Sequence, residues 1–174
     1  NENVDILSVY SKTGELLVES TAVTSNGGAE VRIVELSSDR YLAASYDVKT
    51  VSATGYDIAA QIFDGAGSLI GSEFKLNSTT ENNQQAVELV AIGDGGFAAV
   101  WQSYEQDGEL FDVYFRLFDS NGLAISDEVL VNTSTASTQV KPSIALAGDG
   151  SFIVTWQDDS SGTTEIVYQK LSAS

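Results

Sequence analysis

Side chains able to bind a ligand or a metal gather in two acidic segments of the chain. The segment 103–110 reads SYEQDGEL and the segment 158–165 reads DDSSGTTE. The candidate ligand-binding residues are those whose side chains have oxygen atoms: Tyr104, Glu105, Asp107, Glu109, Asp158 and Asp159. Ca²⁺ takes about 6–8 oxygen ligands and tolerates irregular geometry. Calcium is therefore the one cofactor that we consider, and its candidate ligands are Asp107, Glu109, Asp158 and Asp159. Solvated surface charge is the competing interpretation of the same residues.

A hydrolase with paired carboxylates is the catalytic alternative. Glycosidases need two carboxyl groups about 5–9.5 Å apart, one of them with a raised pKa, and Glu105 with Asp107 is the nearest such pair. No carboxylate pair recurs in a context that indicates burial. The chain contains no histidine and no cysteine, which excludes thiol catalysis, Cys/His zinc sites and every histidine-based triad. We therefore predict that the chain is not an enzyme.

Amide and hydroxyl side chains are concentrated in three further segments. These are TSNGGAE at 24–30, STTENNQQ at 78–85 and TSTASTQV at 133–140. Such groups can donate and accept hydrogen bonds with sugar hydroxyls. In a meander of strands these segments lie at the same end as the two acidic ones, so a glycan is the expected ligand of that end.

An internal repeat must position all of these segments. A shift of 55 residues aligns 56–80 with 111–135 and 93–103 with 148–158. A weaker copy occupies 4–17 and 37–46, with Ser45 at the position of Trp101. We divide a single domain, 1–174, into units of about 4–55, 56–110 and 111–164 and an extra strand, 165–174. The positions that recur are Asp57/Asp112, Phe63/Phe118, Asp64/Asp119, Gly67/Gly122, Asn77/Asn132, Asp94/Asp149, Phe97/Phe152 and Trp101/Trp156.

Within each unit the apolar residues alternate with a period of two, as at Tyr56, Ile58, Ala60 and Ile62, which indicates strands. Asp-x-x-Gly and Asp-Gly sequences between these runs are turn signals. We expect an all-β fold of about three four-stranded antiparallel repeats, arranged as propeller-like blades. Propellers close with about 4–8 blades, so a closed threefold β-trefoil or β-prism is the alternative.

The two tryptophans, Trp101 and Trp156, occupy the same position in two copies of the repeat. Phe97, Ala99 and Trp101 fall on one face of the expected strand. An aromatic residue at a repeated strand position is typical of a core, so we predict that both tryptophans are buried.

The consensus F-D-V-Y-x-R-L-F-D-x-x-G, then V-N-T, then D-G-x-F-x-V-x-W-Q, resembles a tandem β repeat of large secreted bacterial proteins of the hemolysin-type and adhesin-like class. The resemblance covers 56–171 well and 4–46 poorly. It implies propeller-like blades in a secreted or cell-surface protein with an adhesion function. The Gly-Gly-x-Gly-x-Asp nonapeptides that bind calcium in such toxins do not occur in this sequence.

The charge of the chain limits its partners. Asp and Glu number 25 against 8 Lys and Arg, a formal net charge of −17, and the resulting field repels nucleic acid and anionic membrane surfaces. We therefore expect a non-catalytic extracellular binding or adhesion module with a glycan or cell-surface ligand. A structural spacer or assembly segment of a large surface protein is the alternative. Because the strand at 165–174 begins a unit that it does not finish, we also expect it to pair with a second chain in a homodimer; pairing with the chain's own N-terminal region, which would close a ring, is the alternative.

Overall fold

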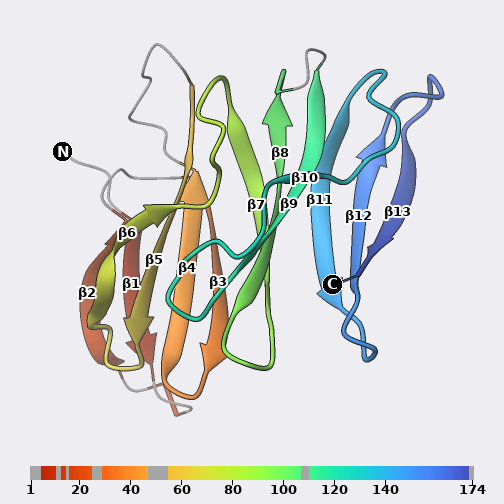
Figure 1. Ribbon diagram of the computed structural model, residues 1–174. Coiled ribbons are helices and arrows are strands. Elements are labelled where there is room, and N and C mark those ends of the chain that lie inside the picture. The colour runs from red at the N-terminus through yellow and green to blue at the C-terminus, as the bar shows by residue number, and fades with distance from the viewer. Residues whose placement is uncertain are drawn as a thin grey trace.

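The computed structural model describes residues 5–10, 13–14, 16–24, 29–46, 55–106 and 110–172, and all regular structure in these ranges is β-strand (Figure 1). The predicted all-β class is therefore confirmed. The strands are β1 (Asp5–Tyr10), β2 (Leu16–Thr24), β3 (Ala29–Ser37), β4 (Arg40–Tyr46), β5 (Ile58–Asp64), β6 (Leu69–Lys75), β7 (Gln84–Ala91), β8 (Phe97–Tyr104), β9 (Phe111–Phe118), β10 (Val129–Leu130), β11 (Gln139–Leu146), β12 (Phe152–Asp158) and β13 (Glu165–Leu171).

The strands form antiparallel sheets that stand side by side as propeller-like blades (Figure 1). Two sheets have four strands, in the orders β3-β4-β5-β6 and β7-β8-β9-β10, and a third has three, β11-β12-β13. A fourth pair, β1-β2, packs against β4 and β5. The first strand of each larger sheet is its inner strand, because β7 contacts both β3 and β11. The inner strands thus surround a common axis, as the propeller prediction requires.

The sheets are offset from the repeat units of the sequence. β4 pairs with β5 along its whole length, from Arg40↔Asp64 to Tyr46↔Ile58, and β8 pairs with β9 from Phe97↔Phe118 to Tyr104↔Phe111. Each of these sheets therefore joins the last two strands of one unit to the first two strands of the next. The connections at 76–83 and 131–138 lead from one sheet into the inner strand of the following sheet, whereas β8 and β9, like β12 and β13, are neighbouring strands of one sheet.

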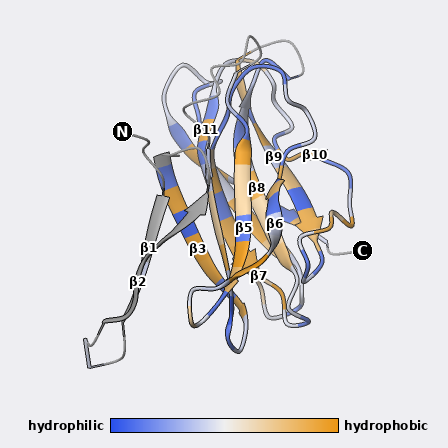
Figure 2. Ribbon diagram, turned by 90° about the vertical axis from the view of Figure 1, so that its left-hand side faces the viewer, coloured by the Kyte–Doolittle hydropathy of each residue, from blue (hydrophilic) through white to orange (hydrophobic). Residues whose placement is uncertain are grey.

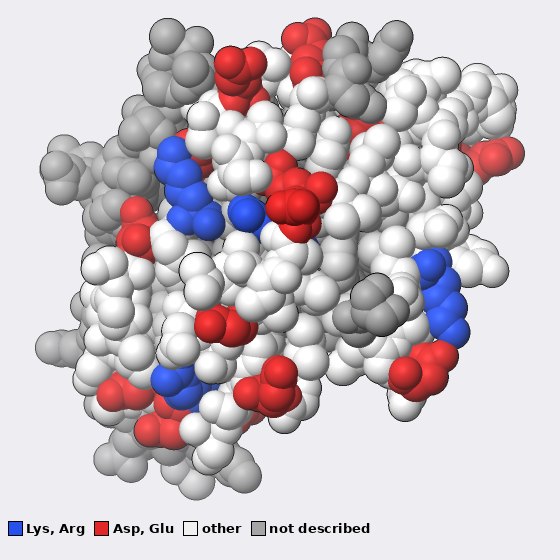
Figure 3. Space-filling model, viewed as in Figure 1, with Lys and Arg blue, Asp and Glu red and all other residues white. Residues whose placement is uncertain are grey.

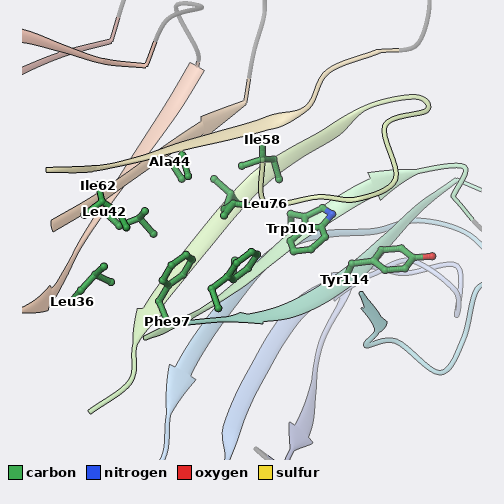
Figure 4. Close-up of a cluster of buried hydrophobic side chains, with 13 residues drawn as sticks. Leu36, Leu42, Ala44, Ile58, Ile62, Leu76, Phe97, Trp101 and Tyr114 are labelled. Atoms are coloured by element: carbon green, nitrogen blue, oxygen red, sulfur yellow. The ribbon is translucent and has the colours of Figure 1, made fainter. Parts of the chain in front are cut away.

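Hydrophobic side chains fill the layers between the sheets. One cluster, drawn in Figure 4, joins the β3–β6 sheet to the β7–β10 sheet and includes Leu42, Phe97 and Trp101. A second cluster joins the β7–β10 sheet to the last sheet and includes Phe152 and Trp156. Trp101 is fully buried and Trp156 is 5% exposed, so the prediction that both tryptophans belong to the core is confirmed.

The number of buried faces differs between blades. Along β8 nearly every residue is buried, which means that both faces of the strand are covered. Hydrophobic residues also run along such middle strands in Figure 2, with hydrophilic residues at the loops. Along β12 buried and partly buried residues alternate, since the last sheet is covered on one face among the described residues.

The recurring aspartates and asparagines support the backbone. Asn77 Oδ1 accepts a hydrogen bond from Ile58 N at 2.8 Å, and Asn77 Nδ2 donates to Asp57 Oδ1 at 2.7 Å. Asn132 repeats the arrangement with Val113 N at 2.8 Å and Asp112 Oδ1 at 2.5 Å. These side chains satisfy backbone groups that would otherwise be buried without a partner, so their recurrence reflects a structural role.

Candidate functional site: an axial pocket

The first feature of the site is a bulge at the start of each inner strand. The register shifts between Ala29 and Arg32 in β3, between Gln85 and Glu88 in β7, and between Val140 and Ser143 in β11. One residue inside each shift has a left-handed backbone: Glu30 with φ 59°, Ala86 with φ 54° and Lys141 with φ 53°. This conformation costs a residue other than glycine about 1–3 kcal/mol. Bulges redirect side chains, and here the same distortion occurs at the same place in three blades.

The three bulge residues open onto one pocket, which we call the axial pocket. Its volume is about 170 Å³ and its lining consists of Glu30, Tyr46, Gln85, Ala86, Gln102 and Lys141. One water occupies about 30 Å³ of liquid, so a ligand larger than a single water molecule can enter. Tyr46 ends β4, and Gln102 lies at the corresponding place near the end of β8. Every blade with an inner strand therefore contributes to the lining.

Hydrogen bonding fixes part of this lining. Lys141 N donates to Gln102 Oε1 at 2.9 Å, which ties the inner strand of the last blade to β8. Gln102 is 6% exposed, so its amide is held in place by packing as well as by this bond. The Tyr46 ring lies 5.9 Å from the Tyr56 ring, centroid to centroid.

The charges of the pocket act on Tyr46. Burial, then the negative charge of Glu30, then Tyr56 raise the pKa of the Tyr46 phenol. The phenol is therefore a hydrogen-bond donor at neutral pH. Besides Tyr46, the lining includes one glutamate, one lysine, two glutamines and the small residue Ala86. Such a set of donors and acceptors suits a small polar ligand with several hydroxyl groups.

Of the six residues selected from the sequence, the four that the structure describes do not line the axial pocket. Tyr104 and Glu105 stand at the β8–β9 hairpin, where Tyr104 packs on Phe111 at 5.0 Å and Glu105 N donates to Leu110 O. A hydrogen bond with Glu105 is the main cause of the raised pKa of Tyr104. Asp107 and Glu109 lie outside the described residues.

Asp158 and Asp159 stand at the β12–β13 hairpin of a different sheet. Burial favours the neutral form of Asp158, but hydrogen bonds from Ser160 and Gln139 outweigh it and lower the pKa of this carboxyl. Asp159 Oδ1 is shielded from solvent and accepts no hydrogen bond from a described residue. In the part of the chain that the structure describes, no three carboxylates gather as a metal site; calcium binding stays a prediction.

The residues that line the axial pocket were not selected from the sequence. Two of the amide-rich segments, 24–30 and 78–85, do end in Glu30 and Gln85. The segments at which we expected a polar ligand therefore contain two of the residues that line the pocket. The available signal was a position near the start of each inner strand that changes type from copy to copy, as Glu30, Ala86 and Lys141 do.

The charged side chains around these elements do not form a single field of one sign. Figure 3 shows acidic side chains scattered over one face, with a few lysines and arginines between them. One ion pair, Arg32 Nε to Glu88 Oε1 at 2.6 Å, joins the inner strands β3 and β7 two residues beyond the pocket. No helix among the described residues is long and apolar enough to cross a membrane.

Comparison with known proteins places the fold among carbohydrate-active enzymes. No protein-family model and no curated protein matches the sequence. Among solved structures, α-L-arabinanase from Penicillium chrysogenum, complexed with arabinobiose, is 14% identical with a TM-score of 0.60, covering 94% of this chain and 54% of that one. An N-acetylgalactosamine deacetylase from F. plautii is 10% identical with a TM-score of 0.60, covering 95% of this chain and 57% of that one.

The NanB sialidase of Streptococcus pneumoniae is 12% identical with a TM-score of 0.57, covering 99% of this chain and 29% of that one. An endo-arabinase, a family-43 glycoside hydrolase and a second sialidase share the fold. The propeller-like class is thus confirmed over the trefoil or prism. This chain spans 64% of the endo-arabinase and 54% of the Penicillium arabinanase, and at these identities the likeness establishes the fold alone.

One prediction from the sequence is wrong in the light of these neighbours. We predicted that the chain is not an enzyme, whereas all six of these structures are enzymes. The absence of histidine and cysteine excludes imidazole and thiol chemistry, but glycoside hydrolysis proceeds with carboxylates.

Proposed function

We propose that this chain acts on carbohydrates, that the axial pocket binds a sugar unit and that Glu30 takes part in cleaving its glycosidic bond. The observation that carries this proposal is the convergence of the three left-handed bulge residues, Glu30, Ala86 and Lys141, on one polar pocket. Backbone strain that recurs at one place is maintained when the surrounding structure over-determines it, and it clusters at functional sites.

The neighbours support the class of substrate. They include an arabinanase complexed with arabinobiose and a deacetylase complexed with a blood-group trisaccharide. The resemblance of the repeat to large secreted bacterial proteins supports an extracellular location, where such glycans are met.

Two groups of the pocket could perform the reaction. Glycoside cleavage normally uses two carboxyl groups, but a tyrosine replaces one of them as nucleophile in sialidases. Glu30 is the carboxylate that lines the described pocket, and its charge acts on Tyr46. In this proposal Glu30 accepts the phenol proton as Tyr46 Oη attacks the anomeric carbon. The bond to the leaving oxygen breaks in the same step, and that oxygen takes a proton from water. The hydroxide left by that water then attacks the anomeric carbon, which releases the sugar from Tyr46 Oη, and the Tyr46 phenolate takes back the proton held by Glu30.

The test is the release of reducing sugar from a panel of arabinans, sialosides and aryl glycosides. General-base catalysis is worth about 10²–10⁴-fold, so Glu30→Gln and Tyr46→Phe should each lower turnover by at least about 100-fold while changing substrate binding only severalfold. The matched control is Glu165→Gln on β13, an exposed glutamate that is not part of the lining.

Two results would contradict the proposal. The first is full activity in Glu30→Gln and Tyr46→Phe. The second is the absence of any carbohydrate binding to the wild-type chain, as measured by NMR titration.

A further inference from the structure

The polar groups of the axial pocket are divided by charge. Glu30 and Tyr46 come from the β3–β6 sheet, whereas Gln102 and Lys141 come from β8 and β11. Between them lies β7, which contacts both β3 and β11 and contributes the small residue Ala86. The pocket therefore has a glutamate from one side and a lysine from the other, with the uncharged residues Gln85 and Ala86 of β7 between them.

The side formed by Gln102 and Lys141 is a pair of hydrogen-bond donors. Gln102 Oε1 already accepts from Lys141 N at 2.9 Å, so the amide nitrogen Nε2 is the polar atom that Gln102 has left to offer. Gln102 is more than nine-tenths buried and lines the pocket, so this donor is held in position before any ligand binds. Lys141 lines the pocket beside it.

Neither charge of the pocket is paired with another described residue. The ion pairs of the described part of the chain use Arg32, Lys75 and Lys170 as their cations. Glu30 and Lys141 line the same pocket without forming an ion pair with each other. A cation and a buried amide donor that converge without a protein acceptor make a site for an external anion.

We infer that the sugar unit bound in the axial pocket carries a carboxylate, so that the ligand class is a sugar acid. Its carboxylate would lie against Lys141 Nζ and Gln102 Nε2, and its hydroxyls would face Glu30, Gln85 and Tyr46. This inference rests on the proposed function, because it names the substrate of the same site.

The net charge of −17 does not oppose this assignment at contact distance. Interactions between exposed charges are largely screened beyond about 8 Å at physiological ionic strength. The charge-assisted hydrogen bonds of Lys141 act at about 2.7–2.9 Å. The local donors therefore decide which ligand stays bound, whereas the distributed acidity slows the approach of an anion.

The experiment compares glucuronate with glucose, a pair that differs only in the carboxylate, by NMR titration of the whole chain. The wild type should bind glucuronate at least about tenfold more tightly, as expected for a charge-assisted contact. Lys141→Met, which keeps the apolar stem, should bind both sugars equally, and Lys141→Arg should restore the preference. Lys170→Met, which removes a cation paired with Asp149 on the surface, is the matched control and should keep the preference.

A second variant guards against a folding defect in Lys141→Met. Gln102→Glu keeps an oxygen for Lys141 N but replaces the amide donor by a negative charge, so it should make the site prefer glucose. Equal binding of the two sugars by the wild type, or a preference that survives in both variants, would overturn the inference and leave carbohydrate binding intact. Binding of neither sugar would overturn this inference, and the proposed function would fall with it only if the arabinans, sialosides and aryl glycosides of the panel also failed to bind.

Discussion

At the scale of single residues, the phenol of Tyr46 reports on the axial pocket. Burial raises its pKa first and the negative charge of Glu30 second. Both causes favour the protonated phenol, because each disfavours a second negative charge in a partly desolvated place. A tyrosine nucleophile needs a base, and Glu30, whose charge raises this pKa, is the group that we propose to take the proton.

We predict that Tyr46 ionises later than a free phenol and that Glu30→Gln moves its ionisation back towards pH 10. The unfolded phenol titrates near its ordinary pKa of 10.0 and the folded one above it. The free energy of unfolding contributed by Tyr46 is thus complete below pH 10 and falls as pH rises through the folded pKa. Absorbance at 295 nm, taken as the difference between each protein and its Tyr46→Phe counterpart, measures the shift.

The control for this titration is Glu165→Gln, which should leave the Tyr46 difference spectrum unchanged. An identical Tyr46 titration in wild type and Glu30→Gln would show that the two side chains do not interact.

At the scale of elements, the bulges decide where the inner-strand side chains point. Much of the scaffold follows from the sequence. Period-two alternation predicts the strands, and Asp64 and Asp119 each accept two backbone N–H groups of the turn that follows, as the Asp-x-x-Gly spacing predicts. The bulges could not be predicted in this way, because a left-handed backbone is usually indicated by glycine, whereas Glu30, Ala86 and Lys141 occupy these positions here.

The distance of each loop from the axis also could not be predicted from the sequence. It depends on which strands pair, and a pattern of alternation is the same for an inner strand and an outer one. The strands β8 and β9, like β12 and β13, pair within one sheet, whereas 76–83 leads directly into β7. Composition therefore pointed to the acidic segments as the candidate site. The axial pocket, by contrast, is lined by residues at the starts of the inner strands.

We predict that Ala86→Gly stabilises the protein by about 0.5–1 kcal/mol, because glycine adopts the left-handed backbone without the penalty that alanine pays. The matched control is Ala99→Gly in the interior of β8, where the alanine is fully buried. That change should destabilise by about 1 kcal/mol or more through the added chain entropy and the lost methyl group. Urea unfolding of the two variants measures both effects, and a loss of stability in Ala86→Gly equal to that in Ala99→Gly would contradict the strain argument.

At the scale of the whole molecule, the last sheet presents one uncovered face among the described residues. Ile166 and Tyr168 on β13 are 71% and 70% exposed, and they alternate with partly buried residues such as Val167. By contrast, the faces of the β7–β10 sheet are both covered by hydrophobic clusters. A solvent-exposed apolar sheet face favours association.

We predict that two copies of the chain associate through this face, with an affinity that rises with salt because the charge of −17 on each copy is then screened. Sedimentation velocity over a range of protein concentrations and salt measures the association, and Ile166→Ser with Tyr168→Ser should weaken it. Thr163→Ala, an exposed substitution in the preceding hairpin, is the control. A single species with the mass of one chain under every condition would exclude the homodimer.

The offset between repeat unit and sheet has a consequence for how such a protein could grow in evolution. A duplication that copies one 55-residue unit does not copy one sheet, because β8 and β9 come from different units and yet pair over eight residue pairs. Each new copy lends two strands to the blade before it and two to the blade after it. Genetic duplication therefore adds a blade whose strands already pair with those of the neighbouring copies. The strand pairing that joins one copy to the next does not involve the three pocket positions, so these positions are free to diverge.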